Sequence, residues 1–175
     1  MKSIVVFFFL ISTSLFSQED SLQFPEKYFG IYKGDLVINN TRGTQTIPME
    51  FHLKAGDSTD VYVYTLVYGA NEQRQERNYN LLAVNAEKGE YVVDENNGIL
   101  LDAQWVDNTL YSSFEVQGNL LTTTERFHEN TMDFEITFSS KESKKVTGTE
   151  GENPIEVISY PITVVQKAHL TKQPE

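Results

Sequence analysis

Cysteine is absent from this sequence of 175 residues. Its absence excludes disulfide bonds, thiol nucleophiles and the lipid-modified cysteine that anchors bacterial lipoproteins. The sequence also contains no Gly-x-Ser-x-Gly and no His-Glu-x-x-His motif, the local patterns of serine hydrolases and zinc proteases. We therefore assign no catalytic residue, no metal ligand and no cofactor from the sequence, and we expect stability to come from packing.

Basic residues are scarce, since 14 Lys and Arg stand against 25 Asp and Glu and give a formal net charge of −11. They are also scattered along the chain, whereas a phosphate-binding surface needs them clustered. Nucleic acid is thus not an expected partner, and repulsion makes an anionic membrane surface unfavourable as well. The same charge favours solubility, and we expect a monomer.

Long apolar runs are missing except near the N-terminus, where residues 4–11 and 15–16 are apolar and follow Lys2. This run is too short and too poorly flanked to span a bilayer, and Ser17 is a small residue that suits a cleavage site. We predict a signal peptide at residues 1–17 and export to the periplasm or the extracellular space. The alternative is a membrane anchor.

The remaining residues, about 158, suit a single domain. The polar residues 18–27 predict a leader, residues 28–168 form the expected β-barrel domain, and residues 169–175 predict a polar tail. Within the domain, residues 139–153 are polar, lack apolar periodicity and carry charges of both signs. This composition predicts a solvated loop.

Helical periodicity is also missing, and the prevailing pattern is the alternation of apolar and polar residues that is typical of strands with one buried face. It is clearest at residues 132–138. Tight turns are predicted at Asn97-Gly98 and Gly118-Asn119, because Asn and Gly accept positive φ. A last strand is expected at residues 155–166, bulged or unpaired on one side at Pro161, since proline donates no ladder hydrogen bond.

About ten such segments, joined mostly by short turns, predict an all-β fold, an up-and-down antiparallel β-barrel. Ten strands enclose more space than eight, whose interior side chains just fill, so a cavity is expected. The alternative is a two-sheet β-sandwich, which leaves no pocket. In residues 61–68 both faces are bulky, so the buried face stays open. The residues expected to point inward include Met49, Phe51, Leu110, Phe114, Phe134, Ile136 and Phe138.

The segment Gly30-Ile31-Tyr32, at the start of the first expected strand, resembles the Gly-x-Trp opening of lipocalins, with Tyr where Trp is usual. The ten-strand count looks like that of fatty-acid-binding proteins and nitrobindins, so the chain resembles the calycin-like group. The sequence departs from fatty-acid-binding proteins in lacking a helical lid between the first two strands. The resemblance implies a small, largely apolar ligand inside the barrel. Haem, which a nitrobindin would hold, needs an inward His that we cannot place.

Two polar residues are candidates for holding a ligand. Arg77 and Tyr79 share one parity of a strand at residues 75–84, and we expect that parity to face the interior. A guanidinium fork and a phenol there would bind a carboxylate, so the expected ligand is apolar or an amphipathic carboxylate such as a fatty acid. The alternative is a solvated cluster of rim charges, because Arg74, Glu76 and Arg77 follow a turn, and such a cluster needs no ligand. The aromatic residues expected to contact the ligand are Tyr32, Phe51, Phe114 and Phe134.

Two other functional classes stay open. A barrel can perform acid–base chemistry with Tyr, Arg and Glu, as the lipocalin-like phenolic acid decarboxylases do, and it can serve as a structural or interaction module of the cell envelope. His52 shares the parity of Glu50 and Lys54, so we expect it on the surface. The segment 94–98 superficially resembles a calcium loop but lacks its spacing, and turn chemistry explains it.

Overall fold

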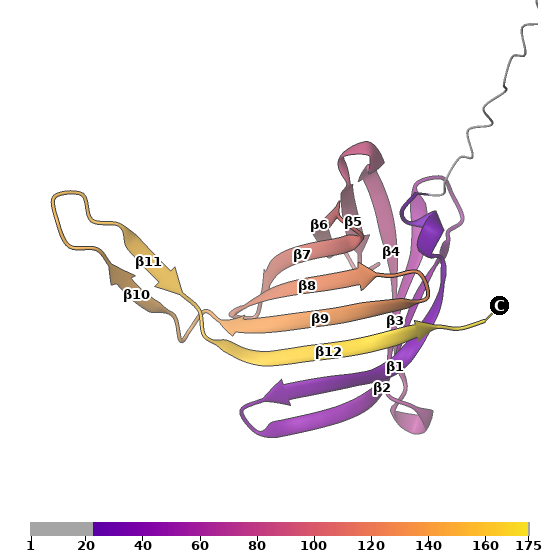
Figure 1. Cartoon of the computed structure of the whole chain (residues 1–175), viewed down its shortest axis with the longest axis horizontal. Helices are drawn as coiled ribbons and strands as arrows, with labels where there is room; N and C mark the ends of the chain where they lie inside the picture. The colour runs from indigo at the N-terminus through magenta and orange to yellow at the C-terminus, as the bar shows by residue number, and fades with distance from the viewer. Residues whose placement is uncertain (1–22, 175) are drawn as a thin grey trace, which may run out of the picture.

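Ten antiparallel strands close into an up-and-down barrel in the computed structural model, which describes residues 23–174 (Figure 1). Around the barrel the strands follow the order β1-β12-β9-β8-β7-β6-β5-β4-β3-β2. The predicted signal peptide at residues 1–17 lies outside the described part of the chain. Within that part, no helix is long and apolar enough to cross a membrane.

The barrel strands are β1 (Gly30–Asn40), β2 (Gly43–Ala55), β3 (Val61–Tyr68), β4 (Gln75–Asn85), β5 (Glu90–Asp94), β6 (Leu100–Val106), β7 (Thr109–Val116), β8 (Asn119–Phe127), β9 (Thr131–Ser140) and β12 (Ile162–Lys172). Two further strands, β10 (Lys145–Gly148) and β11 (Glu156–Ser159), form a separate hairpin. Among residues 23–174 the helical segments are three short 3-10 turns, η1 (Glu26–Tyr28), η2 (Asn71–Gln73) and η3 (Ala86–Lys88).

Closure depends on β1, which pairs with β2 on one side and with β12 on the other. Tyr32 lies opposite Phe51 of β2 and opposite Lys172 of β12. Every barrel strand therefore has two neighbours, and the barrel itself has no open edge. The predicted barrel is confirmed and the alternative sandwich is wrong.

Alternation along each strand sends one parity of side chains into the barrel. Met49, Phe51, Leu110 and Phe134 are at most 2% exposed, as the period-2 pattern predicts. In β3, whose buried face the sequence left open, the inward row carries tyrosines. That row comprises Tyr62, Tyr64, Leu66 and Tyr68. The β-branched row lies on the opposite face of the strand, where Thr65 and Val67 are also buried.

The turns differ in detail from the predicted ones. The β7–β8 turn places Gln117 and Gly118 at φ values of 49° and 77°, one residue earlier than Gly118-Asn119. The predicted Asn97-Gly98 turn is part of a longer loop, because β5 ends at Asp94 and β6 begins at Leu100. Asp107 and Asn108, at φ 47° and 61°, form a β6–β7 turn that we did not predict. Asp and Asn tolerate this left-handed conformation better than most residues.

Aromatic rings fill the end of the barrel where β1 begins. Phe24 stacks on Trp105 with ring centroids 3.7 Å apart, and Tyr28 packs against Phe127 at 5.0 Å. Phe24 and Tyr28 are 7% and 4% exposed. The prediction that residues 18–27 form a polar leader is therefore wrong for Phe24, whose ring helps to plug the barrel. The short η1 turn carries the chain from this plug into β1.

The predicted last strand at residues 155–166 is divided at Pro161. β11 ends at Ser159, β12 begins at Ile162, and the pairing with β9 shifts register between Ile162 and Val164, as expected next to a proline. β12 then continues to Lys172, so the predicted polar tail at residues 169–175 is mostly strand. Leu170 is fully buried opposite Met132, and this burial holds the end of β12 in place.

The segment predicted to be a solvated loop, residues 139–153, forms the end of β9 and the first half of the β10–β11 hairpin. Figure 1 shows the hairpin projecting away from the barrel on the left. All eight strand residues of the hairpin are exposed. The polarity of the segment was interpreted correctly, but its regular pairing was not predicted.

Candidate ligand site in the barrel

A cavity of about 710 Å³ occupies the end of the barrel opposite the aromatic plug. Its outer lining comes from the strand ends beside the β1–β2, β3–β4, β5–β6 and β7–β8 connections, represented by Ile38, Gln75, Glu95 and Gln117. Gln75 and Gln117 are exposed, so the cavity opens to solvent at this end. A ten-stranded barrel was expected to hold such a space.

Most of the cavity wall is apolar. Aliphatic and aromatic residues of strands on all sides of the barrel line it, which suits the body of a hydrophobic ligand. They include Leu36, Leu66, Val93, Leu101, Leu110, Phe114, Leu121, Phe134, Ile136 and Phe138.

A line of polar side chains crosses this apolar wall. Arg77 hydrogen-bonds Tyr79 near the mouth, and the ring of Tyr79 stacks on that of Tyr64 with centroids 6.3 Å apart. The Tyr64 hydroxyl donates a hydrogen bond of 3.1 Å to Oε1 of Glu125. Tyr68 lies within electrostatic reach of Arg77, Tyr79 and Glu125. All five residues line the cavity, so a ligand would meet polar groups along one path from mouth to floor.

Glu125 is the most unusual member of this line. It is 2% exposed, and its neighbours on the adjacent strands are Leu110 of β7 and Phe134 of β9. Burial raises the pKa of Glu125 to about 8, although hydrogen bonds from Tyr64 and Thr123 oppose the shift. The carboxyl group is therefore mostly protonated at neutral pH and can donate a hydrogen bond.

The tyrosines of the cavity stay neutral phenols. Burial raises the pKa of Tyr64 well above its usual value, and the nearby Glu125 adds to the shift. Burial also raises the pKa of Tyr68 and of Tyr79, the nearby carboxylate of Glu95 adds to the Tyr79 shift, and Arg77 partly opposes both shifts. A neutral phenol both donates and accepts hydrogen bonds, so this wall can bind either kind of polar ligand group.

The structure places the predicted site residues in two groups. Arg77, Tyr79, Phe114 and Phe134 line the cavity. Tyr32 and Phe51 are fully buried in the packed end of the barrel and are not part of the cavity lining. Both side chains point into the barrel, as predicted. They lie, however, at the end of the barrel that is filled by the aromatic plug.

The surroundings of Tyr32 explain why it is remote from the cavity. Its hydroxyl donates a hydrogen bond of 2.7 Å to the carbonyl of Tyr28 in the plug, and its ring packs edge-on against Phe127 at 5.9 Å. Burial raises the pKa of Tyr32 to about 12. Tyr32 therefore ties the plug to the barrel wall.

Sequence reasoning missed Glu125, Tyr64 and Tyr68. For Glu125 a signal existed, because it occupies the inward parity of β8 between Thr123 and Phe127. A charged residue in an apolar row is a standard sign of a functional or paired group. For Tyr64 and Tyr68 the sequence held no such signal, because both faces of β3 carry bulky side chains and the alternation does not show which face is buried.

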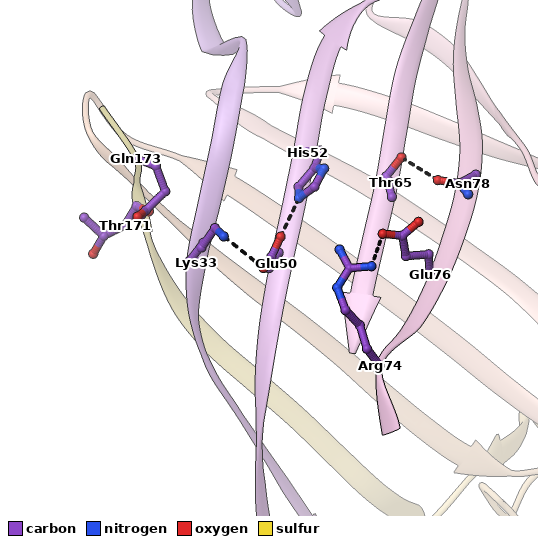
Figure 2. Close-up of polar contacts among 9 residues, drawn as sticks. All are labelled: Lys33, Glu50, His52, Thr65, Arg74, Glu76, Asn78, Thr171 and Gln173. Carbon is purple, nitrogen blue, oxygen red and sulfur yellow. Dashed lines mark hydrogen bonds and ion pairs between the residues drawn. The ribbon is translucent and has the colours of Figure 1, made fainter. Parts of the chain in front are cut away.

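Arg74 and Arg77, close in sequence, point to opposite sides of the barrel wall. Figure 2 shows Arg74 paired with Glu76 on the outer face, near the Thr65–Asn78 contact. Arg77 instead lines the cavity and hydrogen-bonds Tyr79. Arg77 is itself exposed at the cavity mouth, a position compatible both with a ligand contact and with a solvated rim charge.

The three histidines lie outside the barrel. His52 accompanies Glu50 at 2.8 Å, and Lys33 completes this outer cluster at 3.0 Å from the same carboxylate (Figure 2). His128 and His169 share Asp133, at 2.9 and 2.7 Å. Between residues 23 and 174 we find no group of three or more His, Asp or Glu arranged to hold a metal ion.

Comparisons with known proteins leave the architecture as the main guide to function. Neither the protein-family models nor the curated proteins include a match to this chain.

Proposed function

We propose that this protein binds a small amphipathic ligand inside its barrel, with an anionic head group at Arg77 and Tyr79 and an apolar body in the cavity. The observation that carries the proposal is the orientation of Arg77, which turns into the cavity beside a phenol while Arg74 pairs outside. A guanidinium group and a phenol can together hold a carboxylate through charge-assisted hydrogen bonds.

The cavity supports this proposal by its size and lining. A volume of about 710 Å³ lies within the usual range of small-molecule sites. The interior wall is mainly apolar, and five of its polar residues form a line from mouth to floor, while Gln75, Glu95 and Gln117 lie at the mouth. This is the usual division in a ligand pocket, where apolar surface provides affinity and a few polar groups fix the orientation of the ligand. A fatty acid or a similar amphipathic carboxylate fits this division.

The wider setting follows from the sequence expectations. We propose an exported, monomeric binding protein of the calycin-like type, acting in the periplasm or outside the cell. The acidic net charge of −11 supports neither nucleic acid nor an anionic membrane surface as a partner.

Native mass spectrometry of the purified protein, followed by titration with fatty acids, tests the proposal. Arg77→Ala should weaken binding by about 1.5 to 3 kcal/mol, the scale of a hydrogen bond to a charged group. Arg74→Ala is the matched control, because it removes the same charge from the outer face only and should leave the affinity unchanged. Equal affinity of the wild type and Arg77→Ala would contradict the proposal.

A second candidate function is acid–base catalysis in the same cavity, and Glu125 favours it. A carboxyl group with a pKa of about 8 is suited to exchanging a proton near neutral pH, and Tyr64 lies within hydrogen-bond distance. Conversion of a co-purified compound by the wild type, but not by Glu125→Gln, would establish an enzyme. Release of the compound unchanged by both proteins would leave the binding function.

A further inference from the structure

The floor of the cavity is polar at one point, where β8 and β3 face each other across the interior. In the strand order these two strands are five positions apart in either direction around the barrel, so they lie on opposite walls. The Tyr64–Glu125 hydrogen bond of 3.1 Å spans the interior between them. Beneath it lies the aromatic plug, and above it the cavity.

The protein partners of Glu125 are neutral. Oε1 accepts from Tyr64, and Thr123 hydrogen-bonds the same carboxyl group. Among residues 23–174, no Lys, Arg or His forms an ion pair with it. A buried carboxyl group without a cation is favoured in its protonated form, which keeps one O–H donor in addition to its acceptors.

Packing alone does not call for a carboxyl group at this position. The cross-strand neighbours Leu110 and Phe134 are apolar, and an aliphatic side chain of similar size would pack against them without the cost of burying a polar group. Glu125 also lines the cavity, so its free hydrogen-bonding capacity faces the space that a ligand would occupy.

We propose that Glu125 donates a hydrogen bond to a neutral oxygen on the body of the ligand, so that the preferred ligand is an amphipathic acid carrying a carbonyl or hydroxyl group along its chain. This inference rests on the proposed binding function. The polar line connects both contacts, because Arg77 lies at its outer end and Glu125 at its inner end. Arg77 on β4 and Glu125 on β8 therefore contact the ligand from different walls of the barrel.

The test compares hexadecanoic acid with a series of oxohexadecanoic acids that carry one carbonyl at different chain positions. A carbonyl oxygen accepts but never donates, so it reports on a donor in the protein. We expect the wild type to bind at least one oxo isomer about tenfold more tightly than the unsubstituted acid, the scale of one good hydrogen bond.

Two variants assign that preference to Glu125. Glu125→Leu should lose the preference and bind the unsubstituted acid at least as tightly as the wild type does. Glu125→Gln retains an N–H donor and should keep most of the preference. If Glu125→Leu does not fold, Glu125→Met provides the same loss of donor with a longer side chain.

The possible outcomes separate this inference from the proposed function. Tight binding of hexadecanoic acid with no preference for any oxo isomer, or a preference that persists in Glu125→Leu, would overturn the inference and leave the binding function intact. Failure of the wild type to bind any of these acids would overturn the binding function, and the inference with it.

Discussion

Tyr64 and Glu125 join opposite walls of the barrel, the phenol donating to the carboxyl oxygen over 3.1 Å. This contact marks the boundary between two halves of the interior, one packed with aromatic rings and one hollow. It also makes the stability of the fold depend on the protonation state of one carboxyl group.

The first prediction concerns the pH dependence of stability. Burial raises the pKa of Glu125 from 4.5 to about 8, so the native state keeps a proton that the unfolded chain releases between these values. The contribution of Glu125 to the free energy of unfolding should therefore be greatest below pH 4.5. It should fall as pH rises toward 8, by up to about 1.4 kcal/mol per pH unit.

Urea denaturation of the wild type and Glu125→Gln at pH 5, 6, 7 and 8 measures this effect. Because Gln does not ionise, the variant should lack this fall and should be the more stable protein at pH 8. Glu129→Gln, an exposed position in the β8–β9 turn, is the control and should behave as the wild type does. Parallel curves for the wild type and Glu125→Gln would show that Glu125 is already ionised in the native state.

The second prediction compares two phenylalanines in the two halves of the barrel. Phe127 packs against the rings of Phe24, Tyr28 and Trp105 at centroid distances of 5.0 to 5.9 Å, so Phe127→Ala should destabilise the fold by about 3 to 5 kcal/mol. Phe134 borders the cavity, and Phe134→Ala should cost less. Chemical denaturation measures both, and an equal loss would mean that the cavity is filled by packing around Phe134.

The third prediction concerns the free volume of the cavity. Ile136→Trp adds a large ring to the cavity wall and should block fatty-acid binding while changing the free energy of unfolding by less than about 1.5 kcal/mol. Met49→Trp places the same ring in the packed region, where Met49 is 1% exposed, and should destabilise the fold by about 1 to 3 kcal/mol. Isothermal titration and denaturation distinguish the two. Unimpaired binding by Ile136→Trp would place the ligand outside the barrel.

The fourth prediction concerns the projecting hairpin. Replacing residues 142–160 with a short turn should change the free energy of unfolding by less than about 0.5 kcal/mol, because the hairpin strands are wholly exposed. The Ser140 amide already donates to the Pro161 carbonyl at 3.0 Å, which holds the two barrel strands together. Ending the chain at Ala168 is the contrasting change, since it removes the fully buried Leu170 and should destabilise the fold strongly.

Local alternation predicted the barrel because its inward residues follow period-2 rows. The rows containing Phe51 and Phe134 needed only their own sequence neighbours to be interpreted. Arg77 and Tyr79 were located by the same rule. The rule does not provide the level of a residue along the barrel axis, and for this reason Tyr32 and Phe51 were expected at a ligand site although they lie in the packed end, outside the cavity lining.

The remaining differences arise from long-range contacts. Phe24 lies in a polar segment and is buried only because Trp105, far along the chain, offers a ring 3.7 Å away. Leu170 is likewise buried through its pairing with Met132. Such burial depends on closure of the barrel, and a short window of sequence contains no trace of it.

Closure of the barrel through β1 and β12 also determines how the protein can be handled and attached. The start of β1 pairs with the end of β12, and the Gln173 amide donates to the Ile31 carbonyl at 2.7 Å. Both ends of the described chain thus lie at the plugged end, away from the cavity mouth, and Figure 1 shows them on the side opposite the hairpin. A label, carrier or surface joined to either end would leave the mouth facing freely into solution.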